Sequence, residues 1–357
     1  MSGHVPCGAF ECSSGPRDAK IAFVGESWGS QENIQRKPFV GPIGQLFSAL
    51  LAASGIEREA CFLTNALAWH PPSDNLDYAF TSRADASPAS LALGPFKPGK
   101  YLREELLGEL TRLRAELASI KANLVVPLGA LATWALTGDS RISSLRGTIT
   151  STILDGREQK LLPSYHPGYV RHNWADRVVV IADFVKALRE SEFPGIRRPS
   201  RLITINPTLG ELEAWREKLI RAPLLSVDIE TFRGQISCIG FAPSRAEALV
   251  VPFIAFTPSP VSYWPSPADE LCAWNFVRDV LASPAPKLFQ NGLFDLSYLL
   301  PLGLRVENCD EDTLLAHHAL FPEMMKGLGF LGSLYSSEFA WKLMRRRRGA
   351  EQVKRDG

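Results

Sequence analysis

Three polar side chains in the first half of the chain lie where short apolar runs end, and their types could do chemistry together. Glu26 follows the run at residues 21–24, Asn65 lies near the end of the run at 61–66, and His166 follows the run at 160–165. A side-chain amide offers both a donor and an acceptor, and a histidine donor can stabilise negative charge where it forms. Because α/β folds bind ligands at the carboxyl edge of the sheet, we expect the three side chains to meet there.

The loop that carries Glu26 is rich in glycine and contains an aromatic residue. Residues 24–44 read VGESWGSQENIQRKPFVGPIG, and Phe39 lies between turn-forming residues that could fix its orientation. Each side chain also has an ordinary interpretation: Glu26 as a carboxylate at a helix N-terminus, Asn65 as a turn residue, His166 as a satisfied loop histidine and Phe39 as a core aromatic. For any one residue alone the ordinary interpretation is the better one, so the decision depends on what accompanies it.

The elements that must hold these residues alternate between strand and helix. Apolar spacing predicts helices at 43–54, ending before Gly55, and at 101–120, where charged residues stand between leucines. Apolar runs predict strands at 21–24, 61–66, 124–129 and 160–165, with a helix after the third, whereas residues 73–98 are typical of a surface insertion. Alternating strands and helices predict a parallel sheet with right-handed crossovers.

Length and composition limit the classes of protein. A chain of 357 residues predicts two domains. Hydrophobic content of 45%, charged content of 22% and a formal net charge of +1 describe a globular protein whose nucleic-acid surface would be a local patch. Six scattered cysteines suit reduced thiols in a cytoplasm. The apolar stretch 124–136 is short and is interrupted by Pro127 and Gly129, so we expect no membrane span, and no signal peptide is recognised.

Five motifs follow one another in the first 190 residues: GESWGSQE, KPFVG, LTNALAWHPP, VVPLG and YHPG. Together they resemble the uracil-DNA glycosylase superfamily, above all its family-4 branch, which implies a three-layer α/β/α fold around a parallel sheet. The resemblance implies that Phe39 stacks on a flipped uracil, that Asn65 reads its O4 and N3–H, and that His166 bonds its O2. It also implies that Glu26 positions the attacking water or stabilises the sugar cation, and that Glu32 excludes the methyl group of thymine.

The residue types agree with that chemistry. A base inside a duplex must be extruded, at a cost of a few kcal/mol, before an enzyme can act on it. An amide matches the edge of uracil, whereas the edge of cytosine is inverted. Breaking the glycosidic bond leaves an anionic base and a cationic sugar, so a preorganised donor contributes most where the charge forms. This chemistry needs no metal, and we expect no cofactor in the glycosylase-like region.

Two features depart from the family pattern. Ser27 and Trp28 stand where the family has a small residue and a proline, which could alter the placement of water. Family-4 enzymes carry an iron–sulfur cluster on four cysteines, whereas here Cys7 and Cys12 lie near the expected N-terminal pair and no cysteine follows Asn65 before residue 238. Because ligation of a cluster needs the full set of cysteines, we expect no 4Fe–4S cluster.

The second region begins after a segment rich in proline and arginine at 193–207, which places a boundary near residue 200. A helix is predicted at 209–220, and strands at 224–229, 236–242, 248–253 and 287–291, with an antiparallel meander at its centre. Asp228 and Glu230 are two residues apart on a strand, so their carboxylates share one face. An Asn-x-x-x-Asp sequence then runs from Asn291 to Asp295.

These motifs resemble the proofreading 3′–5′ exonuclease domain of family-A DNA polymerases, an RNase H-like α/β fold. The resemblance implies that Asp228, Glu230 and Asp295 could hold Mg²⁺ beside a scissile phosphate. The fourth family carboxylate, in a Tyr-x-x-x-Asp motif, is absent; Asp312 matches a family segment but is not a metal ligand there. We expect an incomplete exonuclease domain that a truncation or frameshift ends early. The alternative for residues 228–231 is a buried strand with a solvated turn.

The sequence as a whole predicts a DNA-processing protein with four segments: a glycosylase-like domain at 1–195, a linker and helix at 196–221, a partial exonuclease domain at 222–342 and a basic tail at 343–357. Its partners would be uracil-containing DNA and a DNA polymerase, without a membrane, in the cytoplasm of a bacterial or phage-infected cell, in base-excision DNA repair linked to DNA replication. Two alternatives stay open: a noncatalytic DNA-binding or polymerase-associated module, and a protein whose main activity is the exonuclease.

Overall fold

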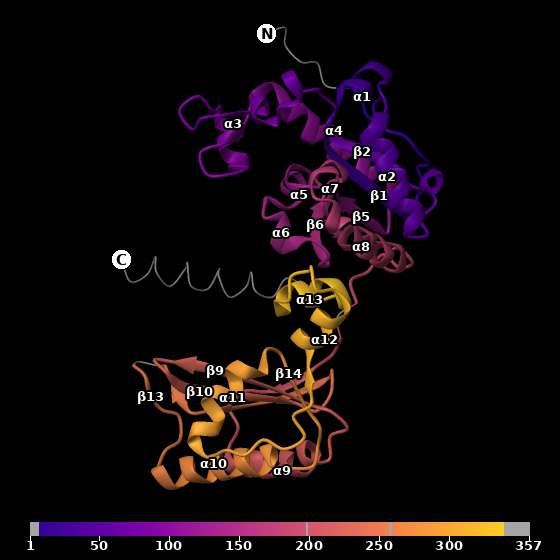
Figure 1. Ribbon diagram of the computed structural model, residues 1–357. Helices are drawn as coiled ribbons and strands as arrows, with labels where there is room; N and C mark the ends of the chain where they lie inside the picture. Colours follow the sequence, from indigo (N-terminus) through magenta and orange to yellow (C-terminus); the bar gives the residue numbers. More distant parts are fainter. Residues whose placement is uncertain (1–6, 198, 257–258, 339–357) are drawn as a thin grey trace. The chain divides into compact units, whose positions relative to one another are not determined.

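The computed structural model describes residues 7–197, 199–256 and 259–338, and the chain divides into two compact units. The first unit comprises the chain up to residue 197 together with the residues from 329 onward, and the second unit spans 198–328. Figure 1 shows both units and labels many of their helices and strands. The predicted basic tail at 343–357 lies outside the described residues.

Among the described residues, the first unit is built on a five-stranded sheet in the order β2-β1-β5-β7-β6. Its strands are β1 (Ile21–Ser27), β2 (Phe62–Leu67), β5 (Leu124–Pro127), β6 (Thr150–Leu154) and β7 (Arg157–Leu161). The predicted parallel arrangement holds for β2, β1, β5 and β7, whereas β6 pairs antiparallel with β7. Strand β6 was not predicted from the sequence. Asp155 and Gly156, between β6 and β7, both have positive φ, as a type I′ hairpin turn requires, and the Asp-Gly pair is the sequence signal for such a turn.

Helices cover both faces of this sheet, which confirms the three-layer α/β/α fold. Helices α2 (Gly41–Ala53) and α8 (Arg177–Glu190) pack on one face, where Phe23, Phe47 and Phe184 meet edge to face. Helices α4 (Leu107–Ile120) and α5 (Ala130–Thr137) cover the other face with the larger apolar cluster. Successive residues of β1 point to opposite faces, so Ala22 and Val24 join the second cluster and Phe23 joins the first.

The predicted helix at 101–120 begins later than expected. Tyr101–Leu102 is strand β4, which pairs with β3 (Phe80–Thr81) in the insertion between β2 and α4, and Glu104–Leu106 is a 3₁₀ turn. The insertion also carries the short helix α3 (Pro88–Leu93). Leucine spacing located the helix, but the pairing that fixes residues 101–102 is long-range and leaves no local signal.

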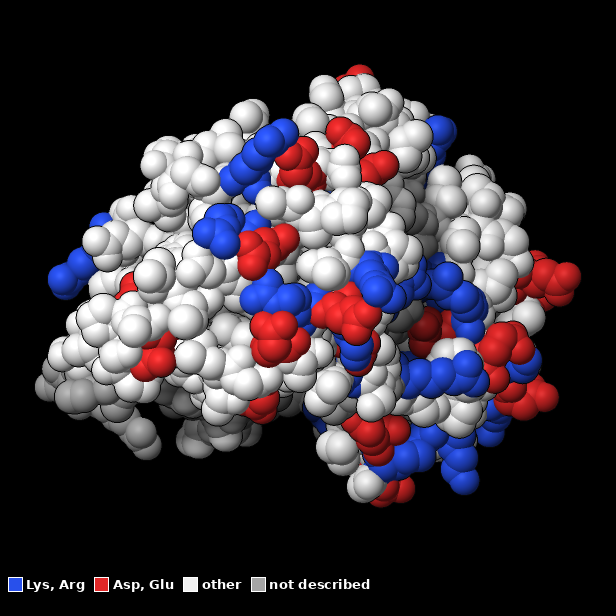
Figure 2. Space-filling model, turned by 90° about the horizontal axis from the view of Figure 1, so that it is seen from below, with Lys and Arg blue, Asp and Glu red and all other residues white. Residues whose placement is uncertain are grey.

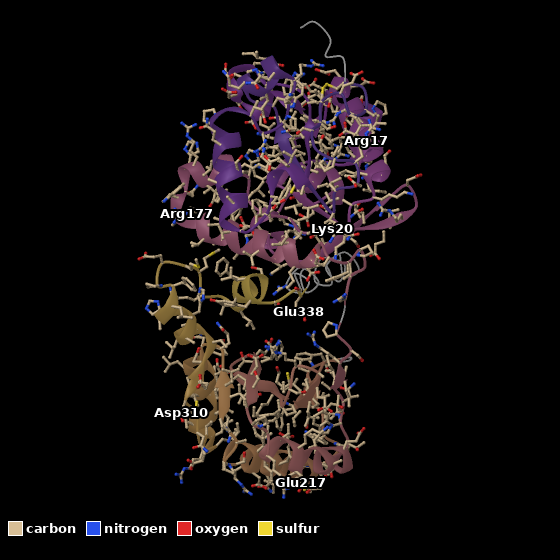
Figure 3. All side chains as sticks on the ribbon, turned by 90° about the vertical axis from the view of Figure 1, so that its right-hand side faces the viewer. Arg17, Lys20, Arg177, Glu217, Asp310 and Glu338 are labelled. Atoms are coloured by element: carbon tan, nitrogen blue, oxygen red, sulfur yellow. A yellow bond between two sulfur atoms is a disulfide. The ribbon has the colours of Figure 1, made fainter. Side chains whose placement is uncertain are left out.

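Helix α4 turns charged side chains toward the sheet as well as away from it. Arg112 is buried and donates to Glu109 (2.9 Å) and to Glu116 (2.8 Å). Its remaining nitrogen donates to the carbonyl oxygen of Asn65 at 2.6 Å, and Glu116 also accepts from the hydroxyl of Thr64. This buried charge network therefore fixes the backbone at the carboxyl end of β2. The exposed pair between Lys20, which Figure 3 labels, and Glu192, with a nitrogen–oxygen distance of 3.2 Å, contributes far less to stability.

The second unit has, among its described residues, a six-stranded mixed sheet in the order β15-β14-β9-β10-β11-β8. The strands are β8 (Leu202–Thr204), β9 (Leu225–Phe232), β10 (Gln235–Ala242), β11 (Glu247–Pro252), β14 (Lys287–Phe289) and β15 (Glu311–Asp312). Strands β9, β10 and β11 form the predicted antiparallel meander, and β14 runs parallel to β9. Helices α9 (Leu209–Ile220) and α10 (Pro267–Leu281) pack together over its core, so this unit is α/β as predicted.

Two segments lie in units other than those the sequence suggested. Within 196–221, expected as a linker and a helix, β8 pairs with β11 and α9 packs on α10, so both belong to the second unit. Part of helix α13 (Leu328–Tyr335) belongs to the first unit, where Arg146 donates to the hydroxyl of Ser333 at 2.9 Å and Lys186 donates to the carbonyl oxygen of Ser336 at 2.5 Å.

Charge on the face drawn in Figure 2 is mixed, with lysine and arginine side chains interspersed among aspartate and glutamate, in keeping with the net charge of +1. No helix in the described part of the chain combines the length and apolar character that crossing a bilayer requires.

We predict that Arg112→Ala lowers the free energy of unfolding by about 3–5 kcal/mol, because the carboxylates of Glu109 and Glu116 would stay buried after losing their cation. Urea denaturation followed by tryptophan fluorescence measures the change. Arg114→Ala is the matched control, since Arg114 lies on the exposed side of the same helix, and it should stay within about 0.5 kcal/mol of the parent protein. Equal losses in the two variants would contradict a special role for the buried network.

Candidate functional site

A pocket of about 460 Å³ lies in the first unit, beside the carboxyl end of β1. Its walls come from the loop after β1, from helix α1 (Ser30–Gln35), from the start of α2 and from helix α7 (Pro167–His172). Three predicted site residues, Glu32, Phe39 and His166, line it. Asn65 lies behind the wall, hydrogen-bonded to the carbonyl oxygen of Ser27, which also lines the pocket.

Gly25 allows two side chains of this site to pack closely against strand β1. A Cβ atom at Gly25 would lie 2.5 Å from the side-chain nitrogen of Asn65 and 2.9 Å from the ring of Phe39. Real Cβ atoms do not come this close to other atoms, so any larger residue would push one of the two side chains away. The glycine therefore brings an amide and an aromatic ring from separate elements against one strand.

Phe39 is 3% exposed and has a left-handed backbone conformation, with φ of 54°. Its ring stacks on Phe47 with centroids 4.4 Å apart, and it lies 6.5 Å from the His166 ring. Gly44 lies directly beneath its carbonyl group, since a Cβ there would be 1.9 Å from the Phe39 oxygen. Arg58, which the sequence reading did not single out, donates to the same oxygen at 2.8 Å. No local pattern marks Arg58, because its contact with residue 39 crosses α2.

Asn65 is 1% exposed and has one polar atom that no described group satisfies. Its Nδ2 donates to the carbonyl oxygen of Ser27 at 3.3 Å, which orients the amide, and its Oδ1 is buried without a hydrogen-bond partner. A buried acceptor without a partner is unusual in a folded protein. The amide thus presents one unused acceptor and, because Nδ2 has two hydrogens, one further donor.

His166 caps α7 and has a defined tautomer. Its Nδ1 accepts from the backbone N–H of Gly168 at 3.1 Å, so in the neutral ring the proton lies on Nε2. Burial lowers the pKa of His166 below its ordinary value, while the charge of Glu26 opposes this shift. The ring is therefore a neutral donor at pH 7.

The loop before His166 is held by a second buried ion pair. Ser164 donates its hydroxyl hydrogen to Asp183 at 2.8 Å, and Asp183 in turn pairs with Arg146, whose Nε lies 3.1 Å from it. The three side chains are all buried. This arrangement fixes the segment two residues before the imidazole.

Glu26 lies at the N-terminus of α5, where its Oε1 accepts from the backbone N–H of Leu131 at 2.9 Å. Gly129 leaves room for this carboxylate, since a Cβ there would be 2.5 Å from Oε1. The ordinary interpretation of Glu26 as a helix N-terminal carboxylate thus describes one of its contacts. Glu26 is not among the residues that line the pocket, but its charge acts on His166, which does line it.

Glu32 lines the pocket, but its carboxylate binds the backbone. One oxygen accepts from the N–H of Gly29 at 2.7 Å, and the other accepts from the N–H of Phe39 in a short hydrogen bond. Burial raises the pKa of Glu32, and these backbone donors oppose the rise. The carboxylate therefore joins α1 to the loop that carries the aromatic ring.

Trp28 fills the space next to the N-terminal cysteines. It is 1% exposed, packs with Cys7, Cys12 and Ala68, lies 5.2 Å beneath the guanidinium of Arg36, and contributes to the pocket wall. Its indole nitrogen is buried without a hydrogen-bond partner among the described groups.

The cysteines do not fit an iron–sulfur cluster. Cys7 and Cys12 form a disulfide, which differs from the expectation of reduced thiols for this pair. The next cysteine, Cys61, is buried and donates to the carbonyl oxygen of Glu57, and burial raises the pKa of its thiol to about 12. Four thiolates are needed, and no further cysteine occurs before residue 238. No step is therefore assigned to a cluster.

The predicted metal ligands of the second unit lie on β9 and on helix α11 (Gly292–Leu299). Asp228 and Glu230 alternate with buried residues on β9, and Asp295 accepts from the backbone N–H of Ile229 at 2.9 Å. Burial raises the pKa of Asp295 to about 6, and the charge of Asp228 adds to the rise. In the part of the chain that the structure describes, no group of three or more His, Cys, Asp or Glu side chains is arranged to hold a metal. No step is assigned to Mg²⁺.

Asp312 has a structural role. It caps helix α12 (Thr313–Leu320) by accepting from the N–H of Leu314 at 2.7 Å, and it accepts from the N–H of Gly292 at 2.7 Å. Such backbone hydrogen bonds lower the pKa of Asp312, against the effect of burial. These contacts tie α12 to the start of α11, which carries Asp295.

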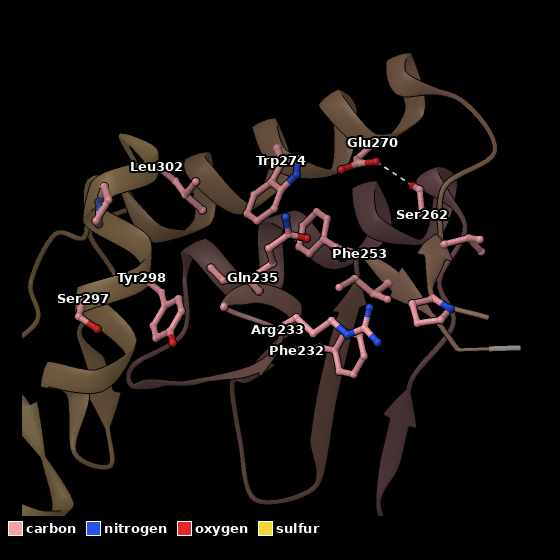
Figure 4. A pocket seen from close by; sticks show the side chains of 16 residues that line it. Phe232, Arg233, Gln235, Phe253, Ser262, Glu270, Trp274, Ser297, Tyr298 and Leu302 are labelled. Carbon is pink, nitrogen blue, oxygen red and sulfur yellow. Dashed lines mark hydrogen bonds between the residues drawn. The ribbon is translucent and has the colours of Figure 1, made fainter.

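A second pocket, of about 810 Å³, opens at the C-terminal end of β9 (Figure 4). Phe253 and Trp274 stack in it with centroids 3.7 Å apart, and Tyr298 lies on α11 one turn beyond Asp295. Gln235 and Arg233 of the β9–β10 turn also line it. The sequence reading did not identify this pocket, because its aromatic residues come from elements far apart in the chain.

The comparisons with known proteins cover mainly the first unit. The family model described as the uracil DNA glycosylase superfamily matches residues 12–190. A type-4 uracil-DNA glycosylase of Thermotoga maritima is 30% identical over 177 residues, which are 48% of this chain and 78% of that protein. The corresponding protein of Archaeoglobus fulgidus is 28% identical over 191 residues, or 52% of this chain and 82% of that protein.

Two solved exonuclease domains are similar to part of the chain, with low TM-scores. The EXD2 exonuclease domain, soaked in Mg and GMP, has a TM-score of 0.24 and 21% identity, covering 34% of this chain and 59% of its own. The EXO domain of Aedes aegypti Nibbler has a TM-score of 0.24 and 17% identity, covering 36% of this chain and 62% of its own. This chain thus spans about three fifths of each.

We predict that His166 stays neutral, with its proton on Nε2, from pH 8 down to below the ordinary histidine pKa near 6.5. Because burial lowers the pKa, stability from this group is present above the unfolded pKa and is lost as the pH falls. Nitrogen-15 NMR of the imidazole, assigned with His166→Gln, reports both tautomer and charge. A ring that is already protonated at pH 7 would contradict the prediction.

Proposed function

Because the chain belongs to the uracil-DNA glycosylase superfamily, we propose that its first unit hydrolyses the N-glycosidic bond of deoxyuridine in DNA. The observation that carries the proposal is the unpartnered Oδ1 of Asn65, whose amide lies directly behind the wall of a pocket lined by Phe39 and His166. Water would add at C1′ of the sugar, and the base would leave as an anion that gains a proton to become free uracil.

Recognition of the base follows from the orientation of Asn65. Its Nδ2 is tied to Ser27, so Oδ1 is set to accept from the N3–H of uracil, and the second Nδ2 hydrogen would serve O4. Cytosine presents an acceptor at N3 and a donor at N4, so the same amide would meet both with the wrong polarity. A buried group left unpaired in this way discriminates strongly.

Phe39 and His166 would act on the two other sides of the base. The Phe39 ring, backed by Phe47, offers a face for stacking, which repays part of the energy of extrusion. The Nε2–H of His166 would donate to O2, where negative charge grows as the bond breaks. A neutral donor suits this role because it can stabilise the anion without first giving up a proton.

Glu26 would act on the sugar side. One carboxylate oxygen is held by the N–H of Leu131, so the orientation of the group is fixed, and the second would orient the attacking water or face the sugar cation. Ser27 and Trp28 follow directly, and the bulk of the buried indole sets how much water the site admits. These roles need no cofactor.

The second unit would bind a nucleic-acid end rather than degrade it. Aromatic rings such as Trp274 stack on bases without regard to sequence, and the pocket of Figure 4 lies one helical turn from Asp295. Asp228, Glu230 and Asp295 are three carboxylates where the resembled exonucleases use four. Such a module, joined to a glycosylase, would couple uracil detection to DNA synthesis beside a polymerase, as in a bacteriophage replication protein in the cytoplasm of the infected cell.

We predict that the protein releases free uracil from an oligonucleotide with one deoxyuridine, in EDTA and without added metal. Chromatography of the released base measures it. Asn65→Ala and His166→Ala should each reduce release by about 100-fold or more, because each loses an interaction made with the reacting base.

Binding of the oligonucleotide by both variants, measured by fluorescence anisotropy, should stay near that of the parent protein. If the parent protein binds the oligonucleotide but releases no uracil at high enzyme concentration, it is instead a noncatalytic DNA-binding module. Parent activity in either variant would mean that the pocket is assigned to the wrong residues.

For the second unit we predict little or no Mg²⁺-dependent shortening of a 5′-labelled single strand from its 3′ end, because this sequence shows three of the four carboxylates that the resembled exonucleases use. Electrophoresis of the labelled strand is the measurement, with Asp228→Ala as the control. Robust shortening that Asp228→Ala abolishes would make the exonuclease an activity of this chain and would require another group in place of the fourth ligand.

A further inference from the structure

We propose that Glu32 and Arg58 are positioning residues that hold Phe39 by its backbone, one at the N–H and the other at the carbonyl oxygen, so that its ring stays in place to stack on a base. The proposal rests on the proposed glycosylase function. It gives Glu32 a role besides the one that the family resemblance implies, and it adds Arg58, which no motif includes.

The backbone of Phe39 needs such support. Its φ of 54° lies in the left-handed region, which residues with a Cβ adopt only when the surrounding structure holds them there. Gly41, two residues further on, also has a positive φ, of 75°, so two of the three residues 39–41 have a left-handed backbone. Without fixed partners, an extended conformation would move the ring away from Phe47.

Glu32 holds the first side of the turn. Both of its oxygens are used by backbone donors, Gly29 N–H and Phe39 N–H, and the side chain is buried. A carboxylate is required for this pattern, because two N–H groups must each find an acceptor. The side chain thereby ties the aromatic loop to the start of α1.

Arg58 holds the second side. Its Nη2 donates to Phe39 O at 2.8 Å, and its Nη1 donates to the hydroxyl of Ser48 at 2.9 Å and reaches Gly44 O at 3.4 Å. Its guanidinium also lies 5.6 Å from the centre of the Phe47 ring, on which Phe39 stacks. Several donors in one rigid plane are a property of arginine that lysine does not share.

The two side chains support each other electrostatically as well. Glu32 and Arg58 carry opposite charges, and each acts favourably on the charged form of the other. Burial opposes both charges, but apolar side chains at these positions would leave the N–H and the carbonyl oxygen of Phe39 without the hydrogen bonds that Glu32 and Arg58 supply. A role in holding the turn therefore accounts for the two charged side chains at positions 32 and 58.

The test is a double-mutant cycle on uracil release, with Arg58→Ala, Phe39→Ala and the double variant. We expect Arg58→Ala to lower kcat/KM by about 10- to 100-fold and the double variant to match Phe39→Ala within about threefold, because Arg58 acts only through the ring. Losses that multiply in the double variant, or an Arg58→Ala protein as active as the parent, would overturn the proposal.

Two further variants separate positioning from folding. Arg58→Lys keeps the charge and should recover only part of the activity, while Glu32→Gln keeps one acceptor and should fall between Glu32→Ala and the parent protein. Arg114→Ala is the matched control, since Arg114 also donates to a backbone carbonyl group, that of Ile153 at 3.3 Å, but lies on the outer side of α4. It should leave kcat/KM unchanged, and melting temperatures show whether each variant is folded.

A readout independent of activity keeps this proposal distinct from the proposed function. With 4-fluorophenylalanine at position 39, fluorine NMR should give one sharp signal in the parent protein and a shifted or broadened one in Arg58→Ala. This result is expected even if the protein releases no uracil. An unchanged signal in a folded Arg58→Ala protein would overturn the positioning role by itself.

Discussion

The close approach across Gly25 is the constraint on which the pocket depends. Because β1 carries no side chain at this position, the amide of Asn65 and the ring of Phe39 can both lie against the strand. Everything around them then serves to keep them there: Ser27 orients the amide, Phe47 backs the ring, and backbone hydrogen bonds hold the aromatic turn. The absence of a side chain at Gly25 thus sets the positions of both the amide and the ring that we propose to bind a base.

Buried charged side chains in the first unit hold the backbone next to Asn65 and His166. Arg112 binds the carbonyl oxygen of Asn65, and Asp183 binds the hydroxyl of Ser164, two residues before His166. Asn65 and His166, the residues proposed to recognise the base, therefore each adjoin a backbone segment that a buried ion pair holds in place. Such pairs contribute little net stability compared with apolar packing, which fits a function in fixing position.

The sequence was sufficient for the four parallel strands of the first unit and for the positions of Glu26 and Asn65 near the carboxyl ends of two of them, because apolar runs and glycine-rich loops are local signals. It was insufficient where two distant segments decide the outcome. The pairing of Tyr101–Leu102 with β3, the reach of Arg58 across α2 and the inward direction of Arg112 all depend on tertiary contacts. For the second unit, the motif placed Asp228 and Glu230 on β9, but the aromatic pocket needed the folded structure.

The unpaired Oδ1 of Asn65 has a consequence for the timing of recognition. Removing bulk water from an acceptor normally costs about 1–3 kcal/mol, and Oδ1 of Asn65 is already shielded from bulk solvent in the folded chain. A base that brings a donor to this atom gains a hydrogen bond without an equal loss of hydration on the protein side. A base that brings an acceptor gains nothing and must give up its own water. In the proposed function, selectivity at this atom would therefore be set by the folded protein before a nucleotide binds.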